Sequence, residues 1–433
     1  MSETRGTWTD KLFFRHNDLP IGLDKARLEC GKLYQSKSSV NTSNYGHLTF
    51  SSQWKQNKHR EVLLGDRIDW YDQTGTPSTD EVDLDYSDNF VRYRSEYCRV
   101  TVGTQKFIWG RIDEQPPTNR ISRADISRGI LPPPPPLSER RRAMPVLRFE
   151  GFQAGYKLDA LCIPDFRKAA LADKASIWYP VNQTNGTIPG FESTPLMKAF
   201  VQQGSISDRA PDGDGGFGLR LSNTDQQFDY AVTIQHARQS TPYWELNPSV
   251  RQAFQNSGDP AGAITSCNGA TFMARYPRTW VADSESGFET LSATWRFEAA
   301  WISDTPVTRK DLRYDTVNSA NWSAGEQFYP GDSDVRMNPI NLIDAPAALS
   351  LTHIYNFNGS TFNEFGNNRW QAKTRFFIGL DQRDIYINTE ISFIGWEPHK
   401  LYAGLHFFNG DEETTADYWE DNSLLTLGWR SQF

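Results

Sequence analysis

The chain has 433 residues, enough for two or three soluble domains or for one large barrel. Charged residues make up 23% and aromatic residues 13% of the chain, which fits a folded protein and not a disordered one. The formal net charge of −8 argues against a nucleic-acid partner. No run of 18 apolar residues predicts a transmembrane helix, but barrel strands escape that criterion because apolar and polar residues alternate along them.

The first residues, Met-Ser-Glu-Thr-Arg, have neither the basic region nor the apolar region of a signal peptide. Either the chain is cytoplasmic or its signal peptide has been removed, and the strand pattern described next favours removal. Four cysteines are at least 64 residues apart and form no CxxC pair, which excludes zinc and thioredoxin-type sites; they are Cys30, Cys98, Cys162 and Cys267. We expect no disulfide and no cofactor.

Near the start of the chain, apolar and polar residues alternate with a period of two. Ala26, Leu28 and Cys30 share one face of a predicted strand, and Lys25, Arg27 and Glu29 share the other. The next strand repeats this order, with Leu48, Phe50 and Trp54 opposite Thr49, Ser51 and Gln53. Pieces of about ten residues with this pattern, separated by polar turns, are typical of barrel strands.

Residues 110–143 form the most distinctive segment, following a predicted strand over 98–109. Its basic residues include Arg120, Arg123, Arg128, Arg140, Arg141 and Arg142. Between them stand five consecutive prolines, Pro132 to Pro136, which predict a stiff polyproline II rod of about 15 Å. We interpret the segment as a re-entrant plug or constriction whose arginines meet lumen carboxylates. The alternative is a rigid surface loop.

The same alternation continues towards the C-terminus. The predicted strands there have apolar faces at 230–234, 295–301, 370–378, 385–393 and 401–407. Their polar faces carry charges of both signs, including Arg296, Glu298, Lys373, Arg375 and Glu390. A sandwich core would not bury such charges, whereas a wet lumen would accept them.

The last strand, Ser423 to Phe433, reads SLLTLGWRSQF. Leu425, Leu427, Trp429 and Phe433 lie on one face, and the pattern lapses only at Ser431. A strand that ends on an aromatic carboxy-terminus is similar to the signal that the barrel-assembly machinery reads, so we predict that Phe433 and Trp429 form this assembly signal.

Aromatic residues at the ends of apolar faces and charges on the opposite faces together predict an all-β protein, a single transmembrane antiparallel barrel over 1–433. We predict about 16 strands, with 14 as the alternative. Long extracellular loops are expected near 165–215, 238–268 and 304–345. The expected lumen or constriction residues are the six arginines of the 110–143 segment with Glu29, Arg296, Glu298, Lys373, Arg375 and Glu390.

Catalytic motifs are absent from the sequence. Seven scattered histidines show no HExxH pattern, and no GxSxG occurs, so we expect no enzyme. A Ser–His pair of the outer-membrane phospholipase kind stays open as a less favoured alternative.

Four stretches between residues 90 and 171 resemble a large family of proteobacterial barrels that is catalogued as domain of unknown function 1302. They are FVRYRSEYCRVTVGTQKFIWGR, NRISRADISRG, AMPVLRFEGF and YKLDALCIPDFRKAAL. The family signature would fall on Gly103, Gln105, Trp109, Gly110, Met144, Arg148, Ile163, Pro164 and Phe166. Thr104 replaces the usual Arg, the five prolines enlarge the re-entrant stretch, and the specific match covers about a fifth of the chain.

The resemblance implies an outer-membrane conduit for lipid-like cargo that works with a periplasmic carrier and an inner-membrane exporter. A barrel moving an apolar or lipid-like cargo is therefore the first functional hypothesis, with outer-membrane lipids and the barrel-assembly machinery as further partners. The alternative is a solute-diffusion porin whose charged lumen residues, Lys25, Arg27 and Arg430 among them, keep the pore wet.

Overall fold

The structure is a computed structural model that describes most of the chain. The residues outside the description are 1–20, 35–38, 113–116, 130–136, 190, 192, 225–227, 291, 331–332, 340–354 and 413. The five prolines at 132–136, and with them the whole predicted polyproline rod, therefore lie outside the described residues.

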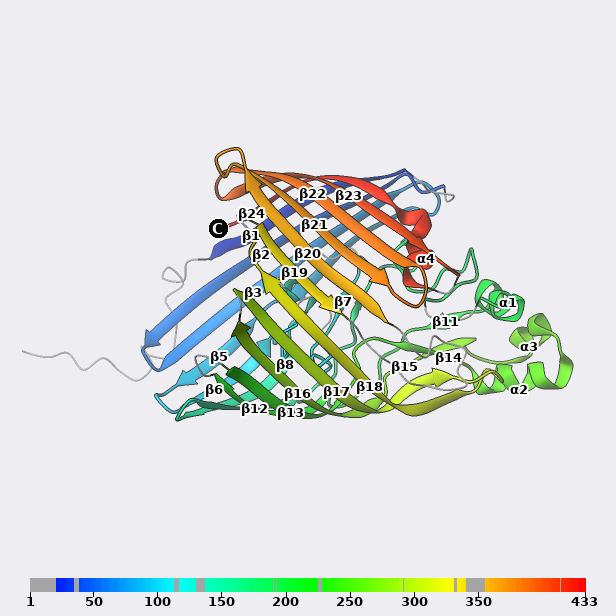
Figure 1. Ribbon diagram of the computed structural model, residues 1–433. Coiled ribbons are helices and arrows are strands. Elements are labelled where there is room, and N and C mark those ends of the chain that lie inside the picture. Colours follow the sequence, from blue (N-terminus) through cyan, green and yellow to red (C-terminus); the bar gives the residue numbers. More distant parts are fainter. Residues whose placement is uncertain are drawn as a thin grey trace, which may run out of the picture.

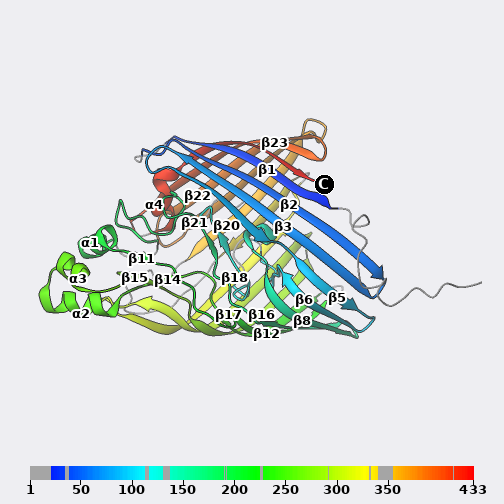
Figure 2. The same ribbon diagram turned by 180° about the vertical axis from the view of Figure 1, so that it is seen from behind.

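One antiparallel sheet closes into a barrel, because β1 (Gly22–Leu33) pairs with both β2 (Thr42–Asn57) and β24 (Leu424–Gln432) (Figures 1 and 2). The wall then runs through β3 (Arg60–Thr74), β4 (Thr79–Tyr86), β5 (Asn89–Arg94), β6 (Cys98–Gln105), β8 (Met144–Gln153), β9 (Tyr156–Ile163), β12 (Gly216–Thr224), β13 (Phe228–Arg238), β16 (Arg278–Thr290), β17 (Ala293–Thr308), β18 (Tyr314–Phe328), β19 (Ser333–Pro339), β20 (Asn356–Phe365), β21 (Trp370–Gly379), β22 (Asp384–Trp396) and β23 (His399–Gly410). Since β4 and β5 both pair with β3 as two parts of one wall strand, the described barrel has 18 strands.

The all-β barrel is confirmed, but the predicted number of strands, 16 with 14 as the alternative, is wrong. Two of the strands, β18 and β19, lie within residues 304–345, which we expected to be a loop. The sequence signal was weak because the inward face of β18 is small and polar, with Ser319, Asn321 and Ser323, and because its outward face includes two alanines beside Trp322.

Burial follows the predicted alternation closely in β24. Leu425 and Leu427 are 51% and 67% exposed on the outside, whereas Thr426 between them is buried. In β1, Leu28 and Cys30 are exposed and Glu29 is buried. The barrel is therefore apolar outside and polar inside, as a membrane-spanning barrel requires.

Aromatic residues gather near both ends of the outer surface. Near one end, the ring of His399 contacts Trp396, Trp429 and Phe433. Near the other end, Trp280 stacks on His236, with ring centroids 4.4 Å apart. Two aromatic belts that flank an apolar band are typical of a transmembrane β-barrel, which we take this chain to be.

The two ends of the barrel differ in their connections. Turns such as 58–59, 154–155 and 397–398 are short and lie at the end that also carries both ends of the described chain (Figure 1). Long connections lie at the opposite end, and that they are extracellular, as the long loops of bacterial barrels are, stays a prediction. They include 106–143, 164–215 and 239–277.

The long connections build a small cap with its own apolar core. It contains α1 (Pro195–Gln203), α2 (Pro248–Ser257), α3 (Pro260–Ser266) and a three-stranded sheet of β11 (Ile206–Ser207), β14 (Tyr243–Leu246) and β15 (Phe272–Arg275). Each of the three helices begins with proline directly after a capping side chain, from Thr194, Asn247 and Asp259. None of the described helices is long and apolar enough to cross a membrane.

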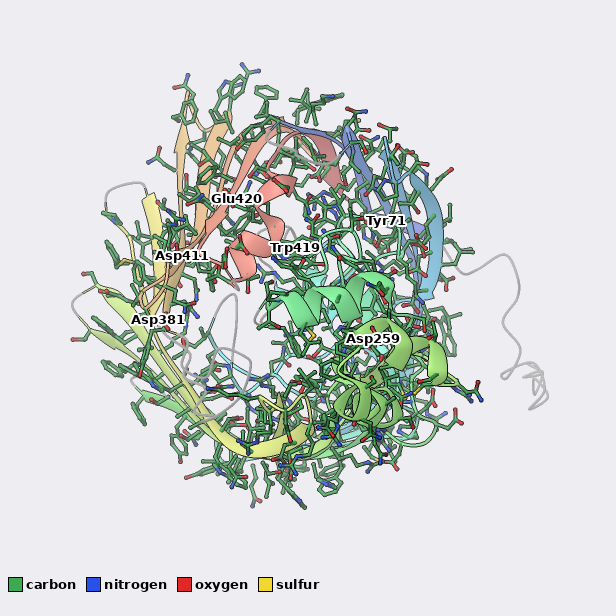
Figure 3. All side chains as sticks on the ribbon, turned by 90° about the vertical axis from the view of Figure 1, so that its right-hand side faces the viewer. Tyr71, Asp259, Asp381, Asp411, Trp419 and Glu420 are labelled. Carbon is green, nitrogen blue, oxygen red and sulfur yellow. The ribbon has the colours of Figure 1, made fainter. Side chains whose placement is uncertain are left out.

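The cap core joins that of α4 (Thr415–Trp419), which follows β23. Trp178 contacts Trp419, with ring centroids 5.4 Å apart, and Phe200 and Phe408 are fully buried. Figure 3 looks onto this end and shows α1, α2 and α3 over one part of the opening, opposite the rim that carries Asp381 and Asp411.

A charge on the outer face near the middle of β24 should destabilise the barrel strongly. We expect Leu427→Arg to cost about 2–4 kcal/mol, because this side chain faces lipid, and Gln432→Arg about 0–1 kcal/mol, because Gln432 lies on the opposite, inward face at the exposed end of the same strand. Reversible urea unfolding in lipid vesicles measures both variants. Equal costs would show that the outward face of β24 is wrongly assigned.

Candidate functional site: the barrel lumen

The segment that follows β6 packs first against an apolar part of the inner wall. Trp109 is buried over Gly218 of β12, where a β-carbon would lie 2.7 Å from its ring, and its indole N–H donates to Asp159 at 3.2 Å. Ile121 and the inward-facing Leu161 belong to the same buried cluster. Glycine at position 218 thus allows the large ring to lie directly on the strand.

The segment next contacts β17 through the buried carboxylate of Glu298. This carboxylate accepts hydrogen bonds from the backbone N–H groups of Arg111 and Ile112 and from the hydroxyl of Thr118. Two backbone N–H groups and a hydroxyl group, and not arginine side chains, therefore hydrogen-bond to Glu298. The guanidinium of Arg111 reaches Asp229 at 2.8 Å.

Arg142 is the centre of a buried charge cluster on the opposite side. Its side chain has no exposed surface, and its nitrogens lie 2.8 Å from Asp125, 3.0 Å from Asp83, 3.2 Å from Asp69 and 3.4 Å from Asp85. Asp69, on β3, also accepts from the guanidinium of the neighbouring Arg67 at 2.5 Å. Asp83 and Asp85 are on β4, so the cluster fastens the segment to the wall of β3 and β4.

Arg67 and Arg123 extend this cluster. Arg67 donates to Asp125 at 2.9 Å, and Arg123 donates to Asp85 at 2.8 Å and to the backbone carbonyl of Lys168 at 2.8 Å. Asp125 lies in β7 (Asp125–Ile126), which pairs in parallel with β10 (Ala170–Leu171). Two long connections are therefore joined inside the barrel.

Burial alone would raise the pKa of Asp125, but Arg142 and Arg67 outweigh it and hold this pKa at about 2. Because this value is below that of an unperturbed aspartate, the ionised form stabilises the folded segment. The contribution is present above about pH 4 and is lost as the pH falls towards 2.

A third anchor lies beside the closing seam of the barrel. Arg128 forms an ion pair with Glu29 of β1, which also accepts from Arg27 at 2.5 Å and from the hydroxyl of Tyr402 at 2.6 Å. The ring of Tyr402 lies over Gly428, where a β-carbon would be 2.3 Å away. Arg128 is therefore one arginine of the segment that contacts a carboxylate of the wall.

The remaining predicted arginines of the segment lie together. Burial, followed by repulsion from Arg140 and Arg120, lowers the pKa of Arg141 to about 10. Arg120 also lines a cavity of about 180 Å³ together with Val281, Ile302 and Asn321.

The predicted charges of β17 to β24 lie on the inner wall. Glu390 accepts from Arg430 at 2.6 Å and lies 3.4 Å from the ammonium of Lys400. Glu390, one of the expected lumen residues, therefore pairs with residues of the wall. Lys373 stands opposite Glu390 in the sheet, Arg375 is buried with its guanidinium 5.6 Å from the ring of Tyr386, and Arg296 donates to Gln327 at 3.0 Å.

A cavity of about 180 Å³ remains between the segment and β1 to β3. Its charged lining has five basic residues, Lys25, Arg27, Arg67, Lys106 and Arg128, and three acidic ones, Asp24, Asp125 and Glu139. The described parts of the segment therefore leave polar space inside the barrel.

Sequence reasoning missed the aspartates that hold Arg142. A signal was available: in the stretch 79–86, Asp83 and Asp85 alternate with Val82 and Leu84. Val82 and Leu84 are 61% and 71% exposed on the outside, so the aspartates point inward. From this acidic inner face and the basic 110–143 segment, a pairing of the two could have been predicted.

Two histidines of the inner wall have polar partners. His47 contacts Asp69 at 2.8 Å, and His406 contacts the hydroxyl of Tyr386 at 3.0 Å. No group of three or more His, Cys, Asp or Glu side chains in the described part of the chain is arranged to hold a metal ion. That the chain is not an enzyme stays a prediction.

The sequence matches no protein-family model and no curated protein. Solved structures similar to the chain include OccK7 (OpdD) of Pseudomonas aeruginosa, with 10% identity, a TM-score of 0.47 and coverage of 96% of this chain and 97% of that one. Another is OmpF of Salmonella typhi, with 9% identity, a TM-score of 0.43 and the same coverage. A mutant of the Rh. blastica porin has 8% identity, a TM-score of 0.39 and coverage of 96% and 100%.

All three TM-scores are below 0.5, so the barrel assignment depends on the strand pairing and on the two faces of the wall. The resemblance to the domain-1302 family stays a prediction.

Removing Arg142 should destabilise the protein because four carboxylates would lose their buried partner. We expect Arg142→Ala to cost about 3–5 kcal/mol. Urea unfolding of the refolded barrel measures it. The control is Arg94→Ala, which removes a half-exposed arginine 3.5 Å from Glu61 and should cost about 0–1 kcal/mol. Similar small costs for both variants would contradict the anchoring role of Arg142.

Proposed function

We propose that this barrel lets small polar solutes diffuse across the outer membrane of a Gram-negative bacterium, with the 106–143 segment as its constriction. The observation that carries the proposal is the polar inner wall from β18 to β24. Its inward residues include Asn321, Ser323, Ser360, Arg375, Asn388, Glu390, Ser392, Thr426 and Arg430. A wall of this kind suits water and hydrated solutes and offers no continuous apolar track.

The segment is anchored mainly to the other part of the wall. Its contacts described above lie on β1, β3, β4, β9, β12, β13 and β17. A passage would then run between the segment and the wall of β18 to β24. This arrangement supports a narrowed pore whose width depends on the buried charge cluster around Arg142.

The two aromatic belts and the exposed aromatic carboxy-terminus support insertion by the barrel-assembly machinery and contact with outer-membrane lipids. Phe433 is 59% exposed, and its backbone N–H donates to the carbonyl of Asp24 at 2.9 Å. The last residue thus extends the seam between β1 and β24.

A lipid-like cargo is the second candidate, and one observation favours it. Strand β4 pairs with β3 alone among the described strands, because β6 ends at Gln105 and the chain then turns into the barrel. Side chains such as Arg123 and Arg167 cover this edge. The guanidinium carbon of Arg167 lies 5.0 Å from the centre of the Tyr86 ring. A wall closed by side chains is a natural place for lateral passage of an amphipathic molecule, delivered by a periplasmic carrier and an inner-membrane exporter.

Shortening the segment should open the pore. We expect replacement of Gln115–Glu139 by a short Gly-Ser linker to raise single-channel conductance in planar bilayers several-fold, because it removes Arg123, Asp125 and Arg128 from the lumen. The triple change Arg120→Ala, Arg123→Ala and Arg128→Ala should give an intermediate, noisier current.

The matched control removes three exposed arginines at the short-turn end, Arg60, Arg94 and Arg369, and should leave the conductance unchanged. Unchanged conductance of the linker variant, in a barrel shown to be folded by its circular dichroism, would contradict the constriction.

Liposome swelling separates the two cargo classes: entry of a small sugar supports diffusion, whereas a linker variant that stays impermeable favours the lipid-like cargo.

Deleting Phe433 should impair assembly more than final stability. We expect less folded protein in the outer membrane of expressing cells but nearly normal refolding into vesicles in vitro, because the side chain is exposed on the outer surface. Heat-modifiable mobility on gels measures the folded fraction in both settings. Equal losses in cells and in vitro would mean that Phe433 acts as a packing residue.

A further inference from the structure

The outward face of β13 and β16 changes from apolar to aromatic to cationic residues towards the end of the barrel with the long connections. Opposite pairs along it are Ile234 with Ala282, His236 with Trp280, and Arg238 with Arg278. Successive steps are about 7 Å apart along the strands. This order, from apolar through aromatic to cationic residues, matches the order of the hydrocarbon, the interface and the phosphate level in a bilayer leaflet.

A groove of about 580 Å³ opens at the level of this arginine pair, between the barrel rim and the cap. The residues that matter for its chemistry are Arg209, Arg238, Arg275, Asp212, Tyr276 and Tyr314. Three guanidinium groups against one carboxylate make the lining basic, in a chain that is acidic overall.

Two of the arginines near the groove are already paired. Arg278 lies 2.8 Å from Asp214, and Arg275 forms an ion pair with Glu245. Arg238 donates to the carbonyl of Tyr276 at 3.2 Å, but its Nε is buried and has no hydrogen-bond partner. A buried donor without a partner costs free energy, so this Nε is poised to receive an acceptor from outside the chain.

Arg209 supplies the second available cation. It is exposed, lines the groove, and forms no hydrogen bond or ion pair within the described part of the chain. Guanidinium groups bind phosphate oxygens through paired N–H donors, so Arg209 and Arg238 together suit a phosphate better than a neutral group.

We propose that this groove binds the phosphate group of an anionic lipid in the surrounding leaflet, with Arg209 and Arg238 as its principal contacts. The acyl chains would then lie along the apolar face below, past the stacked rings of His236 and Trp280. The proposal rests on the outer-membrane location of the proposed function but not on the pore, because Arg238, His236 and Trp280 face outward.

Native mass spectrometry of the full chain in detergent, titrated with diphosphoryl lipid A, tests the site. We expect Arg209→Gln to weaken binding about fivefold, and the double variant with Arg238→Gln about 25-fold, from the contribution of each arginine near a lipid phosphate. Arg209 is exposed and unpaired, so its single variant folds whatever the double variant does. The control is Arg383→Gln, an exposed loop-end arginine 3.1 Å from Asp411 and outside the groove, which should bind like the parent chain.

Three results would overturn the proposal: parental affinity of Arg209→Gln, equal binding of dephosphorylated lipid A, or displacement of the lipid by equimolar inorganic phosphate, which would indicate a site for free phosphate. Single-channel conductance of the variants should equal that of the parent chain. Loss of lipid binding with unchanged conductance supports the lipid site whether or not the pore proposal holds.

Discussion

The pairing of β1 with β24 is the constraint on which the rest of the structure depends. Nine residue pairs, from Lys25–Gln432 to Leu33–Leu424, join the two ends of the described chain. Hydrocarbon offers no hydrogen-bond partner to a free strand edge, so only a closed sheet is stable there. Closure in turn forces every strand to present one face to lipid and one to the lumen, which produces the period of two throughout the sequence.

Closure also sets what the inner wall can hold. The ring of Tyr402 crosses the seam over Gly428 and reaches Glu29, which pairs with Arg27 and Arg128. The residues that close the barrel thus also hold the inward segment, through Arg128. A charged side chain inside the barrel keeps its ionised form through such partners, because the alternative is an unpaired charge at low dielectric.

Local alternation made the strands and the two faces predictable, since each strand carries its own signal. Leu425 and Leu427 outside with Thr426 inside is an example, and so is Glu29 between Leu28 and Cys30. The number of strands was harder to predict, because the outward face of β18 contains alanines. In addition, no local pattern in a sequence indicates how many strands close a barrel.

The candidate site was predictable only in part. A run of arginines indicates that acidic partners exist but not which ones, because the choice depends on side chains brought together by closure. Arg142 meets Asp69, Asp83 and Asp85, which precede it by more than fifty residues. Glu298 differs, because two of its three donors are backbone N–H groups, which no residue type reveals.

The inward segment, the cap and the basic groove all arise from one sector of the wall. Strands β6, β9 and β12 have only 8, 8 and 9 residues, against 16 in β2 and in β17. Where the strands are short, the chain leaves the sheet early, and the connections after β6, β9 and β13 form the inward segment and the cap. The short strands leave an edge of β4 without a second strand, and the returning chain covers it with charged side chains such as Arg123. The inward segment, the cap and the basic groove thus follow from one feature of the fold, the short strands on this side of the barrel. Short strands on this side of the barrel leave the long connections room to fold both into the lumen and over the rim.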